Sequence, residues 1–119
     1  MQVTFESRDP EAIHLQPVAE RRVRLALRRL SWVAPRARVQ LSDVNGPRGG
    51  IDKRCQIELT TDATGPVIVT SMARDWRSAL HSAVARAARA LLHNWQQTRQ
   101  VQQMRRIPRT RLTALPSGT

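Results

Sequence analysis

Four stretches of the chain alternate apolar with polar residues, which is the pattern of strands that bury one face. The first spans residues 2–7, where Val3 and Phe5 share one side. The second follows Pro35, the third surrounds Ile57, and the fourth covers residues 67–72. The apolar side carries Ala37, Val39 and Leu41 in the second stretch and Cys55, Ile57 and Leu59 in the third. The connections between the last three stretches are short enough for an antiparallel meander.

Two further stretches repeat apolar residues at helical spacing. The first begins at about Leu15, tolerates Pro17 in its first turn and is predicted to end near Trp32. The second begins after Asp75, a favourable N-cap residue, and loses its apolar period beyond about Arg99. The apolar stripes are Leu15, Ala19, Val23, Ala26 and Leu30 in the first helix and Trp76, Leu80, Ala83, Ala87 and Leu91 in the second.

The order of these elements predicts an α+β fold. Strand, helix, three strands and helix follow one another, which is a βαβββα order. Because each strand has one apolar side and each helix one apolar stripe, a four-stranded antiparallel or mixed sheet with both helices packed on one face satisfies the pattern. A chain of 119 residues fits a single domain. We expect that domain to span residues 1–99 and residues 100–119 to form a flexible basic C-terminal tail.

Charge narrows the range of functions. Lys and Arg number 20 against 9 Asp and Glu, which gives a net charge of +11, and such a surface attracts polyanions. Lys53 is the only lysine. The guanidinium of the other basic residues suits RNA because it grips phosphate bidentately and stacks on bases. A genome of high GC content would also enrich Arg over Lys, although it would not produce the net charge.

Many basic residues gather on the outward sides of the two predicted helices. The first helix carries five arginines near a single acidic residue, Glu20. The resulting self-repulsion favours a polyanionic partner over the alternative of a merely solvated surface. We predict RNA binding by Arg21, Arg22, Arg24, Arg28, Arg29, Arg48, Lys53, Arg54, Arg86, Arg89, Arg105 and Arg106. Aromatic residues are few and mostly at apolar positions, so recognition is expected to rest on phosphate contacts and RNA shape more than on base stacking.

The sequence offers little for catalysis. Its three histidines stand at no metal-ligand spacing with one another or with Cys, Asp or Glu, and Cys55 lies on the inward side of a strand. The glycine-rich segment 45–50 matches neither common phosphate-loop pattern, so it is either a hairpin connection or a loop that touches RNA or a protein partner. We expect no enzymatic activity, no cofactor, no bound metal and no small-molecule substrate.

Other features favour a cytoplasmic protein without membrane contact. A single cysteine excludes an intramolecular disulfide framework. The N-terminal residues lack the basic and apolar regions of a signal peptide. No apolar segment approaches the roughly 20 residues that span a bilayer.

One segment resembles a known family. The sequence Ser42-Asp-Val-Asn-Gly-Pro-Arg-Gly-Gly-Ile-Asp-Lys-Arg-Cys-Gln-Ile-Glu-Leu59, with the element order and the acid-capped helix at Asp75, resembles the ribosome hibernation-promoting factors, also called ribosome-associated inhibitors. This resemblance covers about residues 1–97. It implies a βαβββα fold similar to double-stranded-RNA-binding domains and binding to rRNA of the small ribosomal subunit, in the channel for tRNA and mRNA. The implied function is to inhibit translation in stressed or stationary-phase cells.

The chain departs from that family in two respects. Members that pair ribosomes carry a second, C-terminal dimerisation domain, whereas only a tail of about 20 residues follows the last predicted helix here. Self-driven ribosome pairing is therefore not expected, and self-association stays open. The helix faces of the family are usually Lys-rich and interleaved with acids, while this chain uses Arg. A regulatory protein-interaction module of the sigma-factor modulator type is the alternative function, acting through the open sheet face or segment 45–50.

Overall fold

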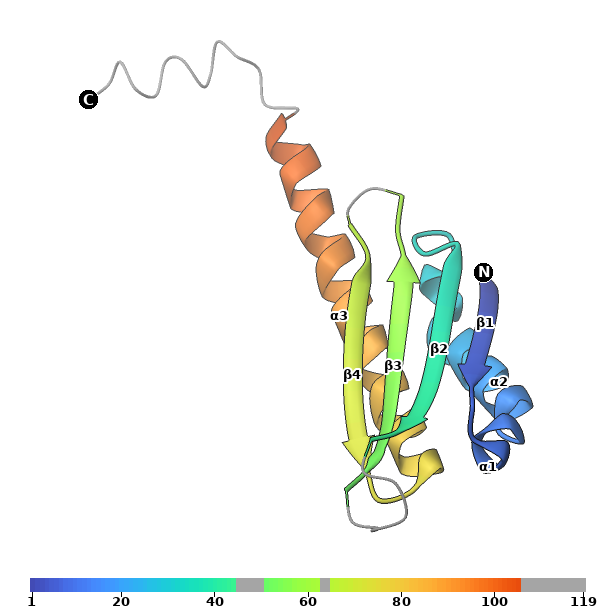
Figure 1. Cartoon of the computed structure of the whole chain (residues 1–119). Helices are drawn as coiled ribbons and strands as arrows, with labels where there is room; N and C mark the ends of the chain where they lie inside the picture. The colour runs from blue at the N-terminus through green and yellow to red at the C-terminus, as the bar shows by residue number, and fades with distance from the viewer. Residues whose placement is uncertain (45–50, 63–64, 106–119) are drawn as a thin grey trace, which may run out of the picture.

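The computed structural model describes residues 1–44, 51–62 and 65–105, with side chains up to residue 99. Strands and helices follow one another in the predicted order (Figure 1). The elements are β1 (Gln2–Ser7), α1 (Pro10–Ile13), α2 (Gln16–Ala26), the 3₁₀ turn η1 (Arg28–Leu30), β2 (Arg36–Asp43), β3 (Lys53–Thr60), β4 (Val67–Ala73) and α3 (Trp76–Arg105).

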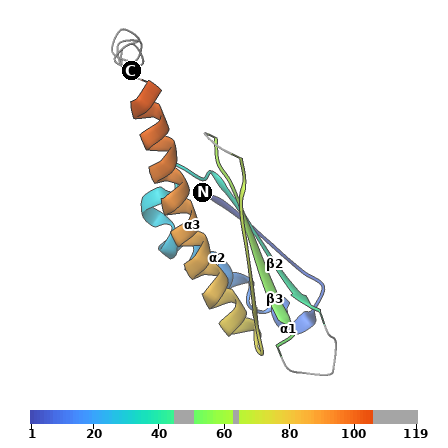
Figure 2. The same ribbon diagram turned by 90° about the vertical axis from the view of Figure 1, so that its left-hand side faces the viewer.

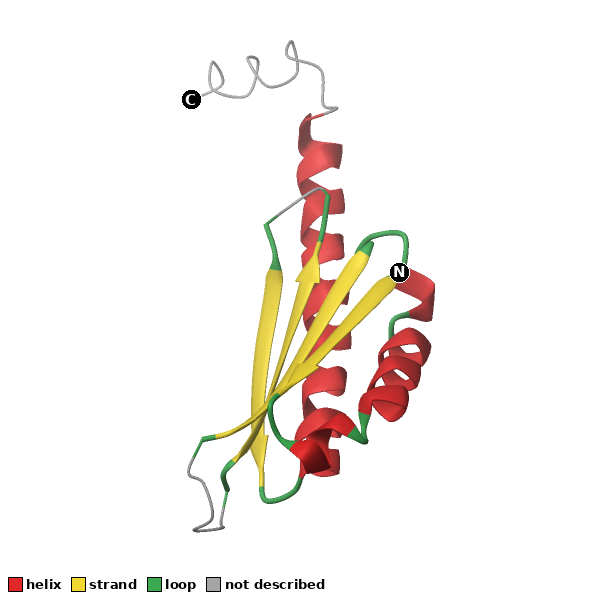
Figure 3. Cartoon of the chain, turned by 45° about the vertical axis from the view of Figure 1, so that its right-hand side comes forward, coloured by secondary structure: helices red, strands yellow, loops and turns green. Residues whose placement is uncertain are grey.

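The four strands form one mixed sheet (Figure 3), in the order β1-β2-β3-β4 (Figure 1). β1 pairs with β2 in parallel, with Val3 opposite Ala37, because α2 carries the chain back along the sheet before β2 begins. β2, β3 and β4 pair antiparallel and form the predicted meander. The predicted α+β fold with a four-stranded sheet is confirmed.

Both long helices cover the same face of the sheet (Figure 2). The core lies between these layers, and its largest fully buried apolar side chains are Val23, Leu27, Val39, Ile57, Leu59, Leu80 and Leu91. The opposite face of the sheet carries the polar members of β2 and β3 and, on β4, Ile68, Thr70 and Met72. The protein therefore presents two different surfaces, the outer side of the helices and the open side of the sheet.

The first helical region differs from the sequence prediction. A separate turn, α1, begins at Pro10 and is capped by Asp9, whose Oδ1 accepts a hydrogen bond from the Glu11 backbone N–H at 2.9 Å. The α-helix predicted to reach Trp32 ends at Ala26, so that expectation was wrong by more than one turn. Leu27 leaves α-helical geometry, at φ −106° and ψ 13°, and the chain tightens into η1 with i to i+3 bonding.

The last helix begins as predicted and runs further. Asp75 caps it, because Oδ1 accepts a hydrogen bond from the Ser78 N–H at 2.8 Å and Oδ2 accepts one from the Ser78 hydroxyl at 2.9 Å. The bonds from Ser78 lower the pKa of Asp75. Helical backbone continues to Arg105, so α3 spans 30 residues, about 45 Å, and projects beyond the sheet (Figure 1). The boundary predicted after residue 99 stays a prediction, since residues 106–119 lie outside the described residues.

Candidate nucleic-acid interface

The arginines of the first helical region lie on the outer side of the helix layer. α2 buries Ala19 and Val23 towards the sheet, and Leu27 follows them into the core. Residues on the other side of this helix therefore face away from the sheet. Arg21, Arg24, Arg28 and Arg29 are exposed, and Arg22 is partly buried.

α3 adds two more arginines, Arg89 on this outer side and Arg86 on the flank beside β4, where its Nη1 donates to the Thr70 carbonyl. Arg86 and Arg89 are both exposed, whereas Ala83, Ala87 and Leu91 on the same helix are buried against the sheet. The predicted separation of a basic and an apolar side therefore holds for both helices. We call the group the helical basic surface, and its members are Arg21, Arg22, Arg24, Arg28, Arg29, Arg86 and Arg89.

Three side chains of the helical basic surface are held by hydrogen bonds to partners other than carboxylates. The pairs are Arg22 Nη1 with His81 Nδ1 at 3.0 Å, Arg24 Nη1 with the Met1 carbonyl at 2.7 Å, and Arg86 Nη1 with the Thr70 carbonyl at 2.9 Å. A carbonyl acceptor, as for Arg24 and Arg86, orients a guanidinium without cancelling its charge. The contact between Arg22 and His81 also ties α2 to α3, so the two halves of the surface are joined.

No carboxylate forms an ion pair with these arginines within the described side chains. The ion pairs in that part of the chain are those of Arg38 with Glu6 and of Lys53 with Asp43 and Asp52. All of them lie away from the helical arginines. The positive charge of the helical basic surface is therefore left for a partner or for solvent ions.

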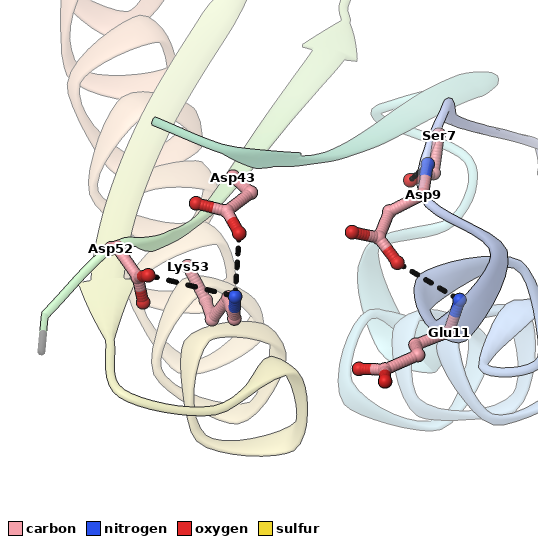
Figure 4. Close-up of polar contacts among 6 residues, drawn as sticks. All are labelled: Ser7, Asp9, Glu11, Asp43, Asp52 and Lys53. Carbon is pink, nitrogen blue, oxygen red and sulfur yellow. Dashed lines mark hydrogen bonds and ion pairs between the residues drawn. The ribbon is translucent and has the colours of Figure 1, made fainter. Parts of the chain in front are cut away.

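Lys53, which the sequence grouped with the RNA-binding residues, lies in an acidic cluster (Figure 4). Its Nζ is 2.6 Å from Asp43 Oδ2 and 3.6 Å from Asp52 Oδ2, and it lies 5.1 Å from the ring centroid of Trp76. The hydrogen bond to Asp43 raises the pKa of Lys53. Because two carboxylates already balance this ammonium, we leave it out of the helical basic surface, and its contact with RNA stays a prediction.

Arg54 lies on the open face of the sheet, on the other side from the helical arginines. Its Nη2 donates to Gln56 Oε1 at 2.8 Å. On the same face Arg38 donates to both carboxylate oxygens of Glu6, at 2.9 and 3.1 Å, and Gln40 donates to Glu6 at 3.0 Å. The bond from Arg38 is the main cause that lowers the pKa of Glu6. A shallow groove on this face is lined by both acidic and basic residues, so its charge is mixed.

The remaining predicted residues are placed only in part. Arg105 is the last residue of α3. Arg48, the segment 45–50 around it, and Arg106 lie outside the described residues.

Trp32 is a surface residue to which sequence reasoning gave no role. Its side chain is 68% exposed. The ring meets Trp95 of α3 edge to face, with centroids 5.9 Å apart and an interplanar angle of 89°. Its Nε1 donates to the Arg29 carbonyl at 3.2 Å. The sequence feature that could have indicated a functional role for Trp32 is its position next to arginines in a segment without acidic residues.

Candidates for chemistry are few in the described residues. Cys55 is fully buried, as its inward strand position predicted, and burial raises the pKa of its thiol to about 12. Within residues 1–44, 51–62 and 65–105, no group of three or more His, Cys, Asp or Glu could hold a metal ion. None of the described helices is long and apolar enough to cross a membrane.

Fold and surface together define a small α+β domain, with a mixed sheet, one helical layer and a basic outer side. A solved structure of this fold is the N-terminal domain of Protein Y from Thermus thermophilus. The two superpose with a TM-score of 0.54 and 23% sequence identity, over 76% of this chain and 96% of that domain. No protein-family model and no curated protein matches the sequence. At this identity the likeness establishes the fold that the two proteins share.

Proposed function

We propose that this protein binds structured rRNA of the small ribosomal subunit through the helical basic surface and inhibits translation, as a hibernation factor of stressed or stationary-phase cells. In this proposal it belongs to the hibernation-promoting family, works in the cytoplasm, and acts by occupying RNA and not by catalysis. The observation that carries the proposal is the helical basic surface itself, whose arginines form no ion pair within the described side chains.

Two further observations support this function. The fold shared with the Protein Y domain agrees with the βαβββα order that the family resemblance implies. The surface also extends over two helices, which Arg22 of α2 links by its hydrogen bond to His81 near the start of α3. A cationic layer whose two helices are linked in this way suits the phosphates of folded RNA, which is recognised largely by shape and backbone contacts.

Co-sedimentation with purified small ribosomal subunits tests the proposal. Wild-type protein should pellet with the subunits at low salt, and the double charge reversal Arg21→Glu with Arg28→Glu should abolish pelleting. The control is Arg8→Glu with Arg36→Glu, which makes the same change of net charge at exposed residues outside the helical basic surface. The control should retain most of the binding. Wild-type protein that stays in the supernatant at low salt would contradict the proposal.

An in vitro translation reaction separates inhibition from mere adhesion. Adding the wild-type protein in excess over ribosomes should lower the yield of a reporter, and the Arg21→Glu with Arg28→Glu variant should restore it. If the protein sediments with the subunits but leaves the reporter yield unchanged, inhibition of translation would be contradicted and binding to the subunit would stand.

The open face of the sheet favours the second candidate, a regulatory protein-interaction module. Ile68 and Met72 of β4 are 54% and 44% exposed there, beside a groove of mixed charge. Such a surface suits a protein partner better than a polyanion. The double reversal Arg24→Glu with Arg28→Glu discriminates between the candidates, because it should abolish RNA binding and leave a protein complex on the other face intact.

A further inference from the structure

Trp32 and Trp95 form a fixed aromatic pair where η1 meets α3. The edge-to-face contact, with ring centroids 5.9 Å apart, braces the Trp32 ring against the long helix. The Trp32 N–H already donates to the Arg29 carbonyl at 3.2 Å. The side chain is therefore held by two independent contacts, and its one polar atom needs no further partner.

What Trp32 offers to solvent is therefore ring surface. At 68% exposure it is the most exposed large apolar side chain of the described residues. Leu92, on the turn of α3 before Trp95, is 43% exposed as well. A single exposed apolar residue is common on protein surfaces. The Trp32 ring differs because Trp95 holds it in place and because a second exposed apolar side chain, Leu92, lies one turn before Trp95 in α3.

The surroundings of the pair are cationic. Arg28 and Arg29 are exposed in η1, and the Arg99 guanidinium carbon lies 5.6 Å from the ring centroid of Trp95. The sequence has no Asp or Glu between residues 21 and 42, and none after Asp75. Both segments that build the site therefore lack any carboxylate of their own.

These features together select one kind of occupant. An apolar protein segment would gain from the ring but would place several guanidinium groups against uncharged surface. An unpaired nucleotide offers a flat base to the ring and a phosphate to the arginines, so it satisfies both. Fully paired RNA offers only the phosphates, since its bases are stacked inside the helix.

We infer that Trp32 stacks on an unpaired base of an RNA that is bound to the helical basic surface, while Arg28 and Arg99 contact the phosphates that flank this base. The inference rests on the proposed RNA-binding function and adds a specific requirement to it, an extruded or single-stranded nucleotide next to a folded RNA. It replaces the expectation from sequence that base stacking contributes little.

Two RNA duplexes that are identical except for a single additional, unpaired adenine in one of them provide the test. Their dissociation constants are measured by fluorescence anisotropy at one salt concentration. Wild-type protein should bind the bulged duplex more tightly by about 5-fold or more, the lower end of what one stacked base contributes. Trp32→Ala should bind both duplexes equally, with an affinity for the paired duplex like that of the wild type.

Two further substitutions of Trp32 and one control variant distinguish ring stacking from a general effect of apolar surface. Trp32→Phe keeps a flat ring and should retain part of the preference, whereas Trp32→Leu keeps apolar bulk without a ring and should lose it. The leucine variant also serves if the alanine variant unfolds. Ile68→Ala removes an exposed apolar side chain on β4, away from the pair, and should change neither affinity.

The outcomes distinguish this inference from the function on which it rests. If wild-type protein binds both duplexes equally, or if Trp32→Ala weakens both by the same factor, stacking is overturned and RNA binding by the helical basic surface stands. If wild-type protein binds neither duplex, both are overturned.

Discussion

The salt dependence of RNA binding measures how many arginines of the helical basic surface contact phosphate. The perturbation is Arg21→Gln with Arg28→Gln, which removes two positive charges from exposed positions without adding negative ones. A plot of the logarithm of the association constant against the logarithm of the salt concentration has a negative slope, and each phosphate contact adds about 0.7 to 0.9 to its magnitude. If all seven arginines of the surface engage, the slope has a magnitude of about 5 to 6.

The double variant should lower the magnitude of this slope by about 1.4 to 1.8. For the wild type, raising the salt from about 50 to about 200 mM should weaken binding on the order of a thousandfold, and for the variant by roughly a tenth of that factor. The assay is anisotropy of a labelled protein titrated with small ribosomal subunits at several KCl concentrations. Magnesium is held constant because it competes for the same phosphates.

The control for this slope is Arg8→Gln with Arg36→Gln, which lowers the net charge equally at exposed residues outside the helical basic surface. It should leave the slope near that of the wild type. A slope that falls equally in both double variants would mean that the total charge attracts RNA without defined contacts. An unchanged slope in the Arg21→Gln with Arg28→Gln variant would refute the assignment of these two arginines to phosphates.

Three predictions concern stability. Cys55→Ser places a hydroxyl at a fully buried site, so the free energy of unfolding should fall by about 1 to 3 kcal/mol, and an unchanged midpoint in urea would contradict this. Glu6 has a pKa below its ordinary 4.5, so its ionised carboxylate stabilises the fold above that pH, and this stabilisation is lost as the pH falls through the lower folded value. Between neutral pH and about pH 3, the melting temperature of Glu6→Gln should therefore drop less than that of the wild type. Asp75→Ala removes the cap of α3 and should lower the melting temperature measured by circular dichroism by several degrees, whereas Asp75→Asn, which can still cap, should recover most of the loss.

The sheet and its buried face could be predicted from sequence because burial follows the strand period. Val39 and Ile57 are fully buried, and the polar residues next to them are at least partly exposed. The parallel pairing of β1 with β2 could not be predicted, since it depends on where the intervening helix returns the chain. The end of α2 at Ala26 was missed because the apolar spacing continues through Leu27 and Leu30 while the backbone tightens into 3₁₀ geometry.

The outward-facing residues of the candidate site could be predicted where the periodicity of a single helix determines which side chains are exposed. Arg21, Arg28 and Arg89 were expected to face outward because buried residues occupy the other side of their helices, and all three are exposed. The surroundings of Lys53 were not predictable, because its contact with Asp43 arises from the antiparallel register of β2 and β3, which pairs these two residues. The contact of Trp32 with Trp95 joins elements far apart in sequence and was inaccessible for the same reason.

The hydrogen bond from Arg86 to the Thr70 carbonyl has a consequence for how these molecules behave at high concentration. β4 is an edge strand, and the backbone N–H and C=O groups along its outer edge could pair with a strand of another molecule. Ile68 and Met72, exposed on the same strand, would make such assembly more favourable. A charged side chain seated on a carbonyl midway along the strand obstructs it. Loss of Arg86 would therefore show itself first as aggregation of folded protein, before any change in the fold itself.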